Sequence, residues 1–271
     1  MTTDNSLSVE NAETVVPFRG GLLTPTWRRG TGAITLFVLI AMWQGASSMG
    51  WISPITAPSP GEVILALWEM VRSGELFGHL AASLGRLFGG FAIGGSTGIA
   101  FGLAVGLWSI MRAPGVTVVA ALFPIPKIAL LPLFIIWFGI GEASKLVTIA
   151  FGTFFPMVVA TYGAVDNVDR TLVRMGRSFG LSTAAIIGKI VLPGALPGIL
   201  SGLRISSSIG IVLLVAAEMI NADQGVGGMV LASGNLYQTD RLLGGVVVLC
   251  MIGLTISALI DVFEKRLLAW R

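Results

Sequence analysis

Long apolar runs separated by short polar connections make up most of the chain after residue 28. A helix needs about twenty mainly apolar residues to cross the hydrocarbon core of a membrane. The runs that meet this requirement cover residues 31–50, 84–108, 115–138, 146–164, 196–220 and 243–263. The pattern therefore predicts an all-α integral membrane protein with six transmembrane helices.

The ends of the apolar pattern divide the chain. Residues 1–27 are polar and aperiodic, which predicts a disordered tail, and residues 28–271 form the predicted membrane domain. Arg28 and Arg29 precede the first apolar run as in an export signal, but no small-residue cleavage site follows, which favours a first transmembrane helix. Residues 61–76 are too charged to span, and their apolar side chains Val63, Leu67, Met70 and Val71 predict a helix lying flat on the outer membrane surface.

Composition supports the membrane assignment and argues against metal-binding, disulfide-bonded and catalytic proteins. Hydrophobic residues make up 54% of the chain and charged residues 11%, whereas soluble domains carry about a quarter charged residues. His79 and Cys250 are the only histidine and cysteine, so the sequence provides neither an internal disulfide nor a metal site. It also contains no phosphate loop and no catalytic motif. We therefore expect no enzymatic activity and no bound cofactor, and nothing indicates nucleic-acid binding.

Lysine and arginine are distributed unevenly between the two sets of connections, and such residues favour the cytoplasmic side. One side receives Arg28, Arg29, Arg112, Arg170, Arg174, Arg177, Lys189, Lys265, Arg266 and Arg271. The opposite side receives Arg72, Lys145 and Arg241, together with six acidic residues. The count predicts that both termini are cytoplasmic. On the same side, Asp166 and Asp169 are expected to pair with Arg170 and Arg174.

The connection between the fourth and fifth predicted spans, residues 166–193, is amphipathic. Its apolar residues Leu172, Met175, Phe179, Ile186 and Ile190 recur at helical spacing, opposite a basic rim. Gly180 favours the left-handed conformation that ends a first short helix, and Ser182 can cap a second. Pro193 is expected to end that second helix. The pattern alone leaves three alternatives open: contact with anionic lipid headgroups, a plain connecting loop, or a helix that docks on a protein.

Ionisable side chains within predicted spans are costly, about 2.5–3.5 kcal/mol each at a helix centre, and so mark candidate functional positions. Lys127, Arg204 and Glu218 are the candidate pathway residues, whereas Arg86 is expected to extend to the outer surface. Lys127 lies among Pro124, Pro126 and Pro132, which predict a broken helix. A cation beside such a break would favour an anionic solute.

Glycines recur at every fourth position in the second predicted span, at Gly90, Gly94, Gly98, Gly102 and Gly106. Small residues at this spacing allow another helix backbone to approach closely. The strip therefore predicts close helix packing, with a ligand-facing groove as the lesser alternative.

Several spaced blocks resemble the permease subunits of binding-protein-dependent ABC importers, in the nitrate, sulfonate, taurine and bicarbonate group. They are ITAPSPGEV at residues 55–63, PIPKIALLPLFIIWFGIGEASK at 124–145, LPGALPGILSGLRIS at 192–206 and AAEMI at 216–220. Gly180, Ile190, Leu192 and Pro193 match the second half of the family's coupling-loop motif. The preceding triplet, Arg174-Met175-Gly176, lacks the acidic residue that the motif places there.

This resemblance implies a type I importer permease in a bacterial cytoplasmic membrane, with a coupling helix on the cytoplasmic side. It further implies a second permease copy, two ATPase subunits that bind ATP and magnesium, and an outer solute-binding protein. The implied coupling-loop residues are Arg174, Met175, Gly176, Phe179, Gly180, Ile186, Ile190, Leu192 and Pro193, and the implied solute is small and anionic. The competing functions are an ion-coupled secondary transporter, a membrane-embedded enzyme, and a scaffold that recruits a cytoplasmic partner.

Overall fold

The computed structural model describes residues 28–53, 55–221 and 223–268, and its regular elements are helices throughout these ranges. The predicted tail, residues 1–27, lies outside them. The α-helices are α1 (Arg28–Ser48), α2 (Pro60–Arg72), α3 (Glu75–Leu107), α4 (Ser109–Leu122), α5 (Leu131–Phe138), α6 (Glu142–Asp166), α7 (Arg170–Ser178), α8 (Thr183–Ile186), α9 (Leu192–Asn221), α10 (Val226–Asn235) and α11 (Thr239–Leu267). A 3₁₀ turn, η2 (Lys127–Leu130), precedes α5, and a π-helical segment, η3 (Ile187–Val191), joins α8 to α9.

Four helical stretches of the described chain are long and apolar enough to cross a membrane: α3, α6, the continuous helix 183–220, and α11. The fourth and fifth helices, α4 and η2–α5, qualify together as one broken span with a bend of 85°. The apolar part of α1, Gly32–Ser48, is shorter than the other candidates. The all-α membrane fold is confirmed, and the broken helix predicted around Lys127 is the bend of this pair. By length and composition the described chain has four spans, or five if the bent pair counts as one, where six were predicted, because the apolar part of α1 is short.

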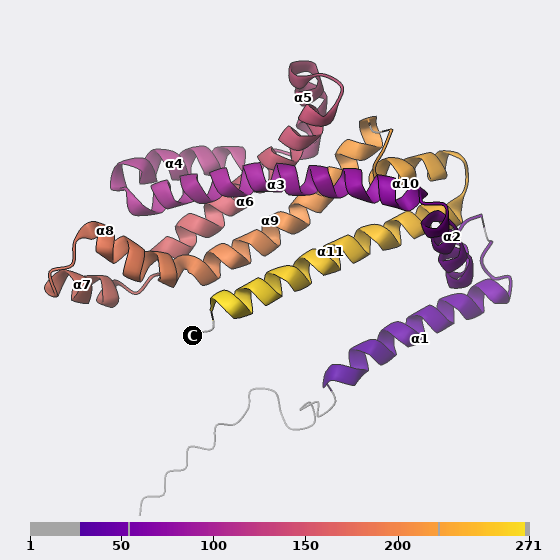
Figure 1. Ribbon diagram of the computed structural model, residues 1–271, viewed down its shortest axis with the longest axis horizontal. Helices are drawn as coiled ribbons and strands as arrows, with labels where there is room; N and C mark the ends of the chain where they lie inside the picture. The colour runs from indigo at the N-terminus through magenta and orange to yellow at the C-terminus, as the bar shows by residue number, and fades with distance from the viewer. Residues whose placement is uncertain (1–27, 54, 222, 269–271) are drawn as a thin grey trace, which may run out of the picture.

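The long helices α3, α6, α9 and α11 run roughly along the long axis of the molecule (Figure 1). Helices α7 and α8 lie at one end and α2 and α10 at the other, while α1 stands apart and packs mainly on α2. The described chain begins with α1 and finishes with α11, and both of these chain ends point toward the end that carries α7 and α8 (Figure 1). The start of α1, the end of α11 and the α7–α8 corner thus share one end of the molecule, and which side of the membrane this end faces stays a prediction.

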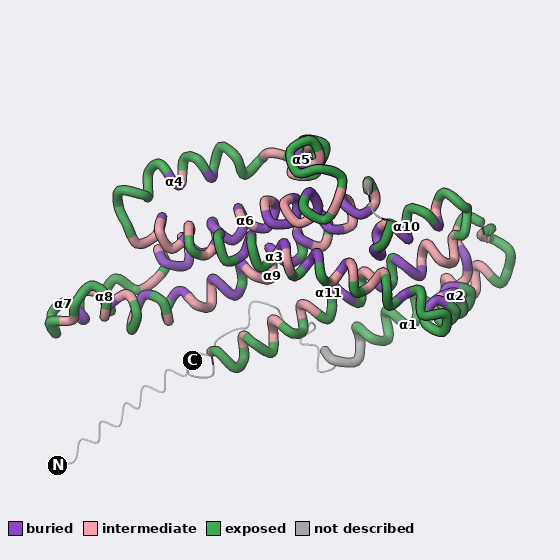
Figure 2. The backbone as a smooth tube through the Cα atoms, turned by 45° about the horizontal axis from the view of Figure 1, so that its top comes forward, coloured by how far each residue is buried: buried purple, intermediate pink, exposed green. Residues whose placement is uncertain are grey.

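The core is centred on the contact between α3 and α6, where most of the buried positions in Figure 2 lie together with those of α9. The glycine strip of α3 faces α6 here. A Cβ atom added to Gly98 would lie 2.7 Å from Cβ of Met157, and one added to Gly102 would lie 2.6 Å from Cβ of Thr161. Side chains at these positions would force the two helices apart, so the glycines permit the close packing.

Two features of the end that carries α2 and α10 differ from the sequence prediction. Helix α2 does not present its apolar face to the membrane surface, because Met70 is fully buried in the core and Leu67 packs beside it. The same two side chains lie against Gly244 of α11. Helix α10 was not predicted, since its ten residues contain three glycines and resemble a loop in composition.

Proline explains the break in the third span. Pro124 and Pro126 remove backbone donors between α4 and η2, so the helical hydrogen bonds cannot continue through this stretch. Pro132 lies in the first turn of α5, where a missing donor costs nothing. Pro124 and Pro126 therefore break the helix, whereas Pro132 lies in the first turn of the next one.

Candidate functional site

The α7–α8 segment, residues 166–193, forms a well-defined corner at one end of the molecule. Asp169 caps α7 by accepting a hydrogen bond of 2.7 Å from the backbone N–H of Thr171, and this bond lowers the pKa of the Asp169 carboxyl below its usual value. At the other end of α7, Gly180 has φ +73°. The N–H of Gly180 donates to the carbonyl of Arg177, and that of Leu181 donates to the carbonyl of Gly176. These two bonds make a Schellman motif, which favours glycine at this position.

Ser182 begins the second helix of the corner, and its hydroxyl accepts a hydrogen bond of 3.3 Å from the N–H of Ala185. This helix does not end at Pro193, contrary to the sequence prediction. Helices α8 and α9 and the π-helical segment between them form one continuous helix over residues 183–220. The wider π turns end at Val191, two residues before Pro193, whose ring removes a donor in the first turn of α9, and so the helix continues past the proline.

The apolar face predicted for the α7–α8 segment is divided in two. Leu172, Met175 and Phe179 of α7 are exposed, Phe179 at 80%. Ile186 is buried and Ile190 packs beside it in a core cluster with α6 and α9 residues. Helix α7 rests on this cluster through Gly176, where an added Cβ atom would lie 2.9 Å from Ile190 Cδ1. The exposed apolar face is therefore confined to α7.

The acidic residues next to α7 do not form the predicted ion pairs. Asp166 accepts two hydrogen bonds of 2.6 Å from the guanidinium group of Arg112, which lies on α4. Asp169 is used as the cap of α7. Within the described chain, the side chains of Arg170, Arg174 and Arg177 have no carboxylate within ion-pair distance.

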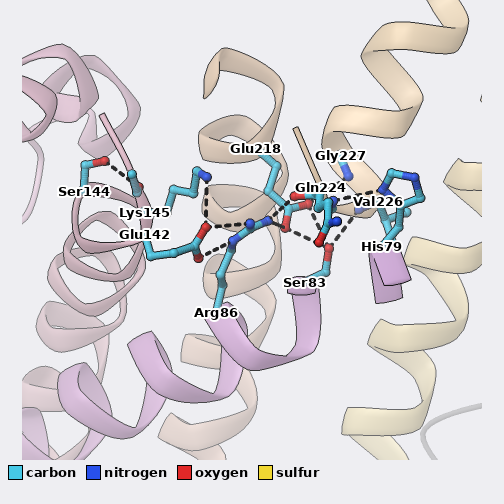
Figure 3. Close-up of polar contacts among 12 residues, drawn as sticks. His79, Ser83, Arg86, Glu142, Ser144, Lys145, Glu218, Gln224, Val226 and Gly227 are labelled. Atoms are coloured by element: carbon cyan, nitrogen blue, oxygen red, sulfur yellow. Dashed lines mark hydrogen bonds and ion pairs between the residues drawn. The ribbon is translucent and has the colours of Figure 1, made fainter. Parts of the chain in front are cut away.

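A polar cluster at the opposite end joins α3, α6, α9 and the start of α10, and it is buried except at Gln224 and at Glu142, whose side chain is 59% exposed (Figure 3). We call it the Arg86 cluster, and it contains Ser83, Arg86, Glu142, Lys145, Glu218, Gln224, Val226 and Gly227. Arg86 donates to Glu142 over 2.6 and 2.7 Å and to Glu218 over 2.7 Å. It also donates to the backbone carbonyl of Gln224. The guanidinium group thus ties together three helices and a loop.

Glu218 is fully buried in this cluster, with 0% of its side chain exposed. Its carboxylate also accepts hydrogen bonds from the Ser83 hydroxyl at 2.8 and 2.9 Å and from the N–H of Gly227 at 2.9 Å. Arg86, expected to extend to the outer surface, is instead buried beside it. Glu218 is accordingly a buried carboxylate with several partners in this structure, and its place in a solute pathway stays a prediction.

Sequence reasoning singled out Arg86 and Glu218 separately but did not pair them, because they lie 132 residues apart. Glu142 and Lys145 were assigned only to the outer connection, and Ser83 carried no signal beyond its position three residues before Arg86. One signal was available: a cation in one apolar span and a carboxylate in another are each costly alone and can neutralise each other by pairing.

Lys127 lies at the break of the third span. Its amino group donates to the backbone carbonyl of Phe123 and lies 4.9 Å from the centre of the Phe123 ring and 5.5 Å from that of Phe155. Lys127 and Pro126 also line an almost wholly apolar cavity of about 350 Å³ against Ser208 and Val212 of α9. The cation is therefore held by a carbonyl and two aromatic rings at the edge of this cavity.

Arg204, the remaining candidate pathway residue, is bound to α11. It forms ion pairs with Asp261 and with Glu264, the latter at 2.8 Å. This arrangement gives Arg204 a structural role in joining α9 to α11, and the structure does not bring it together with Lys127 or Glu218. Among the described residues, no three His, Cys, Asp or Glu side chains are grouped so that they could hold a metal ion.

Comparison with known proteins places the chain among transporters. Residues 98–269 match the family described as the inner membrane component of binding-protein-dependent transport systems. The chain is 36% identical over 241 residues to the taurine transport system permease protein TauC of Escherichia coli strain K12, covering 87% of this chain and 88% of that protein. It is 34% identical over 266 residues to a Bacillus subtilis strain 168 protein named as an aliphatic sulfonates transport permease, SsuC, covering 98% and 95%.

Solved structures agree in fold. The chain resembles the methionine ABC transporter MetNI in an inward-facing conformation, with a TM-score of 0.57 and 21% identity, over 78% of this chain and 98% of that one. It also resembles an amino acid ABC transporter crystallised with histidines, with a TM-score of 0.56 and 19% identity, over 74% and 98%. At this level of identity the likeness concerns the fold.

Proposed function

Because the chain belongs to the family of binding-protein-dependent transport system inner membrane components, we propose that it forms the solute path of an ATP-driven importer for a small anion of the sulfonate, taurine or nitrate class. Family membership makes the chain an ABC importer permease and disfavours the secondary transporter and the scaffold. The observation that carries the proposed coupling is the α7–α8 segment, an exposed apolar helix face fixed at the base of a membrane-spanning helix.

The proposed anionic solute rests on two supports. Relatives at 34–38% identity are named for aliphatic sulfonates and taurine, which are compounds with a sulfonate group. Lys127 places a cation at the break of the third span, beside an apolar cavity. A solute with one charged end and a short apolar body would suit such a place, since the cation attracts the charge and the apolar wall accepts the rest.

An importer permease works with an ATPase and a solute-binding protein, and we propose the complete assembly as two copies of this chain, two ATPase subunits and one outer solute-binding protein. ATP and magnesium would bind to the ATPase subunits, where hydrolysis would take place, and this chain would bind no cofactor. We place it in the bacterial cytoplasmic membrane with both termini and the α7–α8 segment on the cytoplasmic side, as the charge distribution favours.

The coupling proposed here uses the exposed face of α7. Leu172, Met175 and Phe179 would enter a groove on the ATPase, in the manner of an amphipathic helix bound through its apolar face. Gly176, Gly180 and Ser182 shape the corner that presents this face, and Arg174 lies on the other side of α7. Ile186, Ile190, Leu192 and Pro193 would carry the motion onward, since they belong to the helix that continues into the membrane span. Movement of the ATPase pair would thereby shift α9 as a rigid body.

The test is uptake of radiolabelled taurine into vesicles that contain this chain, its ATPase and its binding protein, with and without ATP. Uptake should require ATP and the ATPase. Gly180→Asp should reduce ATP-dependent uptake and ATPase co-purification at least about tenfold, a loss of about 1.4 kcal/mol in docking. The variant should still insert into the membrane.

Gly74→Asp is the matched control. Gly74 lies between α2 and α3 and has φ +80°, and an added Cβ atom would meet nothing within 4 Å at either glycine. The two variants therefore add the same charge and the same backbone strain at opposite ends of the molecule, and Gly74→Asp should retain ATPase binding. Uptake without the ATPase, or normal uptake in Gly180→Asp, would refute the proposal.

A further inference from the structure

The face of α7 that bears its arginines borders a cavity. Arg170, Arg174 and Arg177 recur at spacings of four and three, and at about 100° per residue they share one side of the helix. By the same geometry Leu172, Met175 and Phe179 share nearly the opposite side. Partner docking through the apolar side would thus leave the basic side directed elsewhere.

The cavity on the basic side has a volume of about 330 Å³ and is bounded by α7 and by the ends of α3 and α6. Its polar part is formed by the three arginines and Asp166, and its apolar wall includes Leu107, Val165 and Val191. Arg112 occupies both carboxylate oxygens of Asp166, so the acidic residue is already neutralised. The three arginine side chains have no acidic partner in the described chain. The cavity therefore offers several guanidinium donors to an anion.

The position of the cavity identifies the kind of anion. Helix α3 has 33 residues and is about 50 Å long at 1.5 Å per residue, which is longer than a hydrocarbon core of about 30 Å. Its end at Leu107 lies among the charged side chains of Arg112, Asp166 and the α7 arginines, which favours this end as one that lies outside the core. Trp108 follows directly and is exposed, as is typical of tryptophan at the boundary between hydrocarbon and headgroups. The cavity thus lies at headgroup level, with an apolar wall on one side and arginines on the other.

We propose that this cavity binds the phosphate group of an anionic phospholipid. Arginine suits phosphate because its planar group donates two parallel hydrogen bonds. Basic pockets between spans at the cytoplasmic boundary are suited to anionic headgroups in the same way. A free phosphate has the same chemistry but makes no use of the apolar wall. The proposal does not depend on the import function, since lipid binding is a property of this chain alone.

The test is native mass spectrometry of the purified full-length chain in detergent, titrated separately with phosphatidylglycerol, phosphatidylcholine and inorganic phosphate. Wild-type protein should retain phosphatidylglycerol in preference to both other probes. The double variant Arg174→Gln/Arg177→Gln should bind phosphatidylglycerol at least about tenfold more weakly, since each arginine near an anionic lipid contributes about fivefold. Lys189→Gln should bind normally, because Lys189 is an exposed cation of the same segment that does not border the cavity.

Equal retention of phosphatidylglycerol and phosphatidylcholine, or an unchanged affinity in the double variant, would overturn the proposal. If inorganic phosphate displaces phosphatidylglycerol at equal concentration, the cavity binds free phosphate, and the proposal that the bound phosphate group belongs to a lipid is wrong. If the double variant loses ATPase co-purification while keeping its lipid affinity, the arginines serve the ATPase and the proposal is also wrong. A matching size-exclusion profile for all three proteins verifies that folding is unchanged.

Discussion

The Arg86 cluster and the α7–α8 segment both contain several charged side chains, but the cations are paired in the first region and, within the described residues, unpaired in the second. In the Arg86 cluster the cation is buried and bonded to two carboxylates and a backbone carbonyl. In the α7–α8 segment the arginines have no acidic partner in the described chain, and Phe179 is 80% exposed. The charges of the first region are paired within the chain, whereas the second region presents cations and an apolar face that have no such partners in the described residues.

The difference follows from where each region lies along the helices. The Arg86 cluster is held between helices that already pack on one another, and an unpaired charge there would be costly. The α7–α8 segment extends beyond the ends of α3 and α6, where water can solvate its cations at little cost. Partnered charge therefore marks a region that holds the molecule together, and unpartnered charge beside an exposed apolar face marks a region that binds something.

The largest effect on stability should come from removing the buried cation of the Arg86 cluster. Arg86→Leu leaves Glu218 buried without its cation and should lower the free energy of unfolding by about 3 kcal/mol or more. Thermal unfolding in detergent, followed by size-exclusion chromatography, measures the change. Arg241→Leu is the control, because Arg241 also pairs with a carboxylate, Glu75, at the same end of the molecule, but both side chains are partly exposed.

The control should cost about 1 kcal/mol or less, as partly exposed ion pairs generally do. Equal losses in the two variants would show that burial does not distinguish these pairs, and the contrast between the two regions would then lose its physical basis.

A smaller loss of stability is expected where α3 and α6, the helices that carry Arg86 and Glu142, pack closely on one another. Gly98→Ala places a methyl group within 2.8 Å of the Phe154 carbonyl and should destabilise the protein by about 1–3 kcal/mol. Gly78→Ala, on the same helix, meets nothing within 4 Å and should be neutral or slightly stabilising. The same melting assay applies, and a Gly98→Ala protein as stable as Gly78→Ala would contradict the packing role of the strip.

The smallest effect on stability, and the sharpest on binding, is expected in the α7–α8 segment. Phe179→Ala should leave the melting temperature unchanged but weaken ATPase co-purification about tenfold, since burying such a side chain contributes about 1.5–3 kcal/mol. Leu236→Ala is the control, because Leu236 is exposed at the opposite end of the molecule. If Phe179→Ala lowers stability without affecting ATPase binding, the exposed face is not a docking surface.

Local chemistry predicted much of the segment in advance. Gly180 adopts the left-handed conformation expected of it, and Ser182 caps the second helix, because both effects depend only on neighbouring residues. Pro193 was misread because a proline near a helix end and a proline after a π turn look identical in sequence. The division of the apolar face also escaped prediction, since it depends on where α6 and α9 lie.

Long-range pairing set the other limit. Arg86 and Glu218 were each recognisable as costly charges, but which cation meets which carboxylate depends on which helices lie side by side. Arg204 shows the same limitation, because its partners Asp261 and Glu264 lie on the last helix. Hydropathy predicted the span positions and the prolines predicted the break in the third span, but its angle of 85° depends on how the neighbouring helices pack.

The unbroken helix over residues 183–220 has a mechanical consequence. From Thr183 to Glu218 it is about 50 Å long at 1.5 Å per residue, so a tilt of about 5° at its base would displace its far tip by about 4 Å. That tip carries the carboxylate bonded to Arg86. A small rotation of the corner at one end of this helix would therefore displace Glu218 at the other end by a larger distance and would strain its ion pair with Arg86.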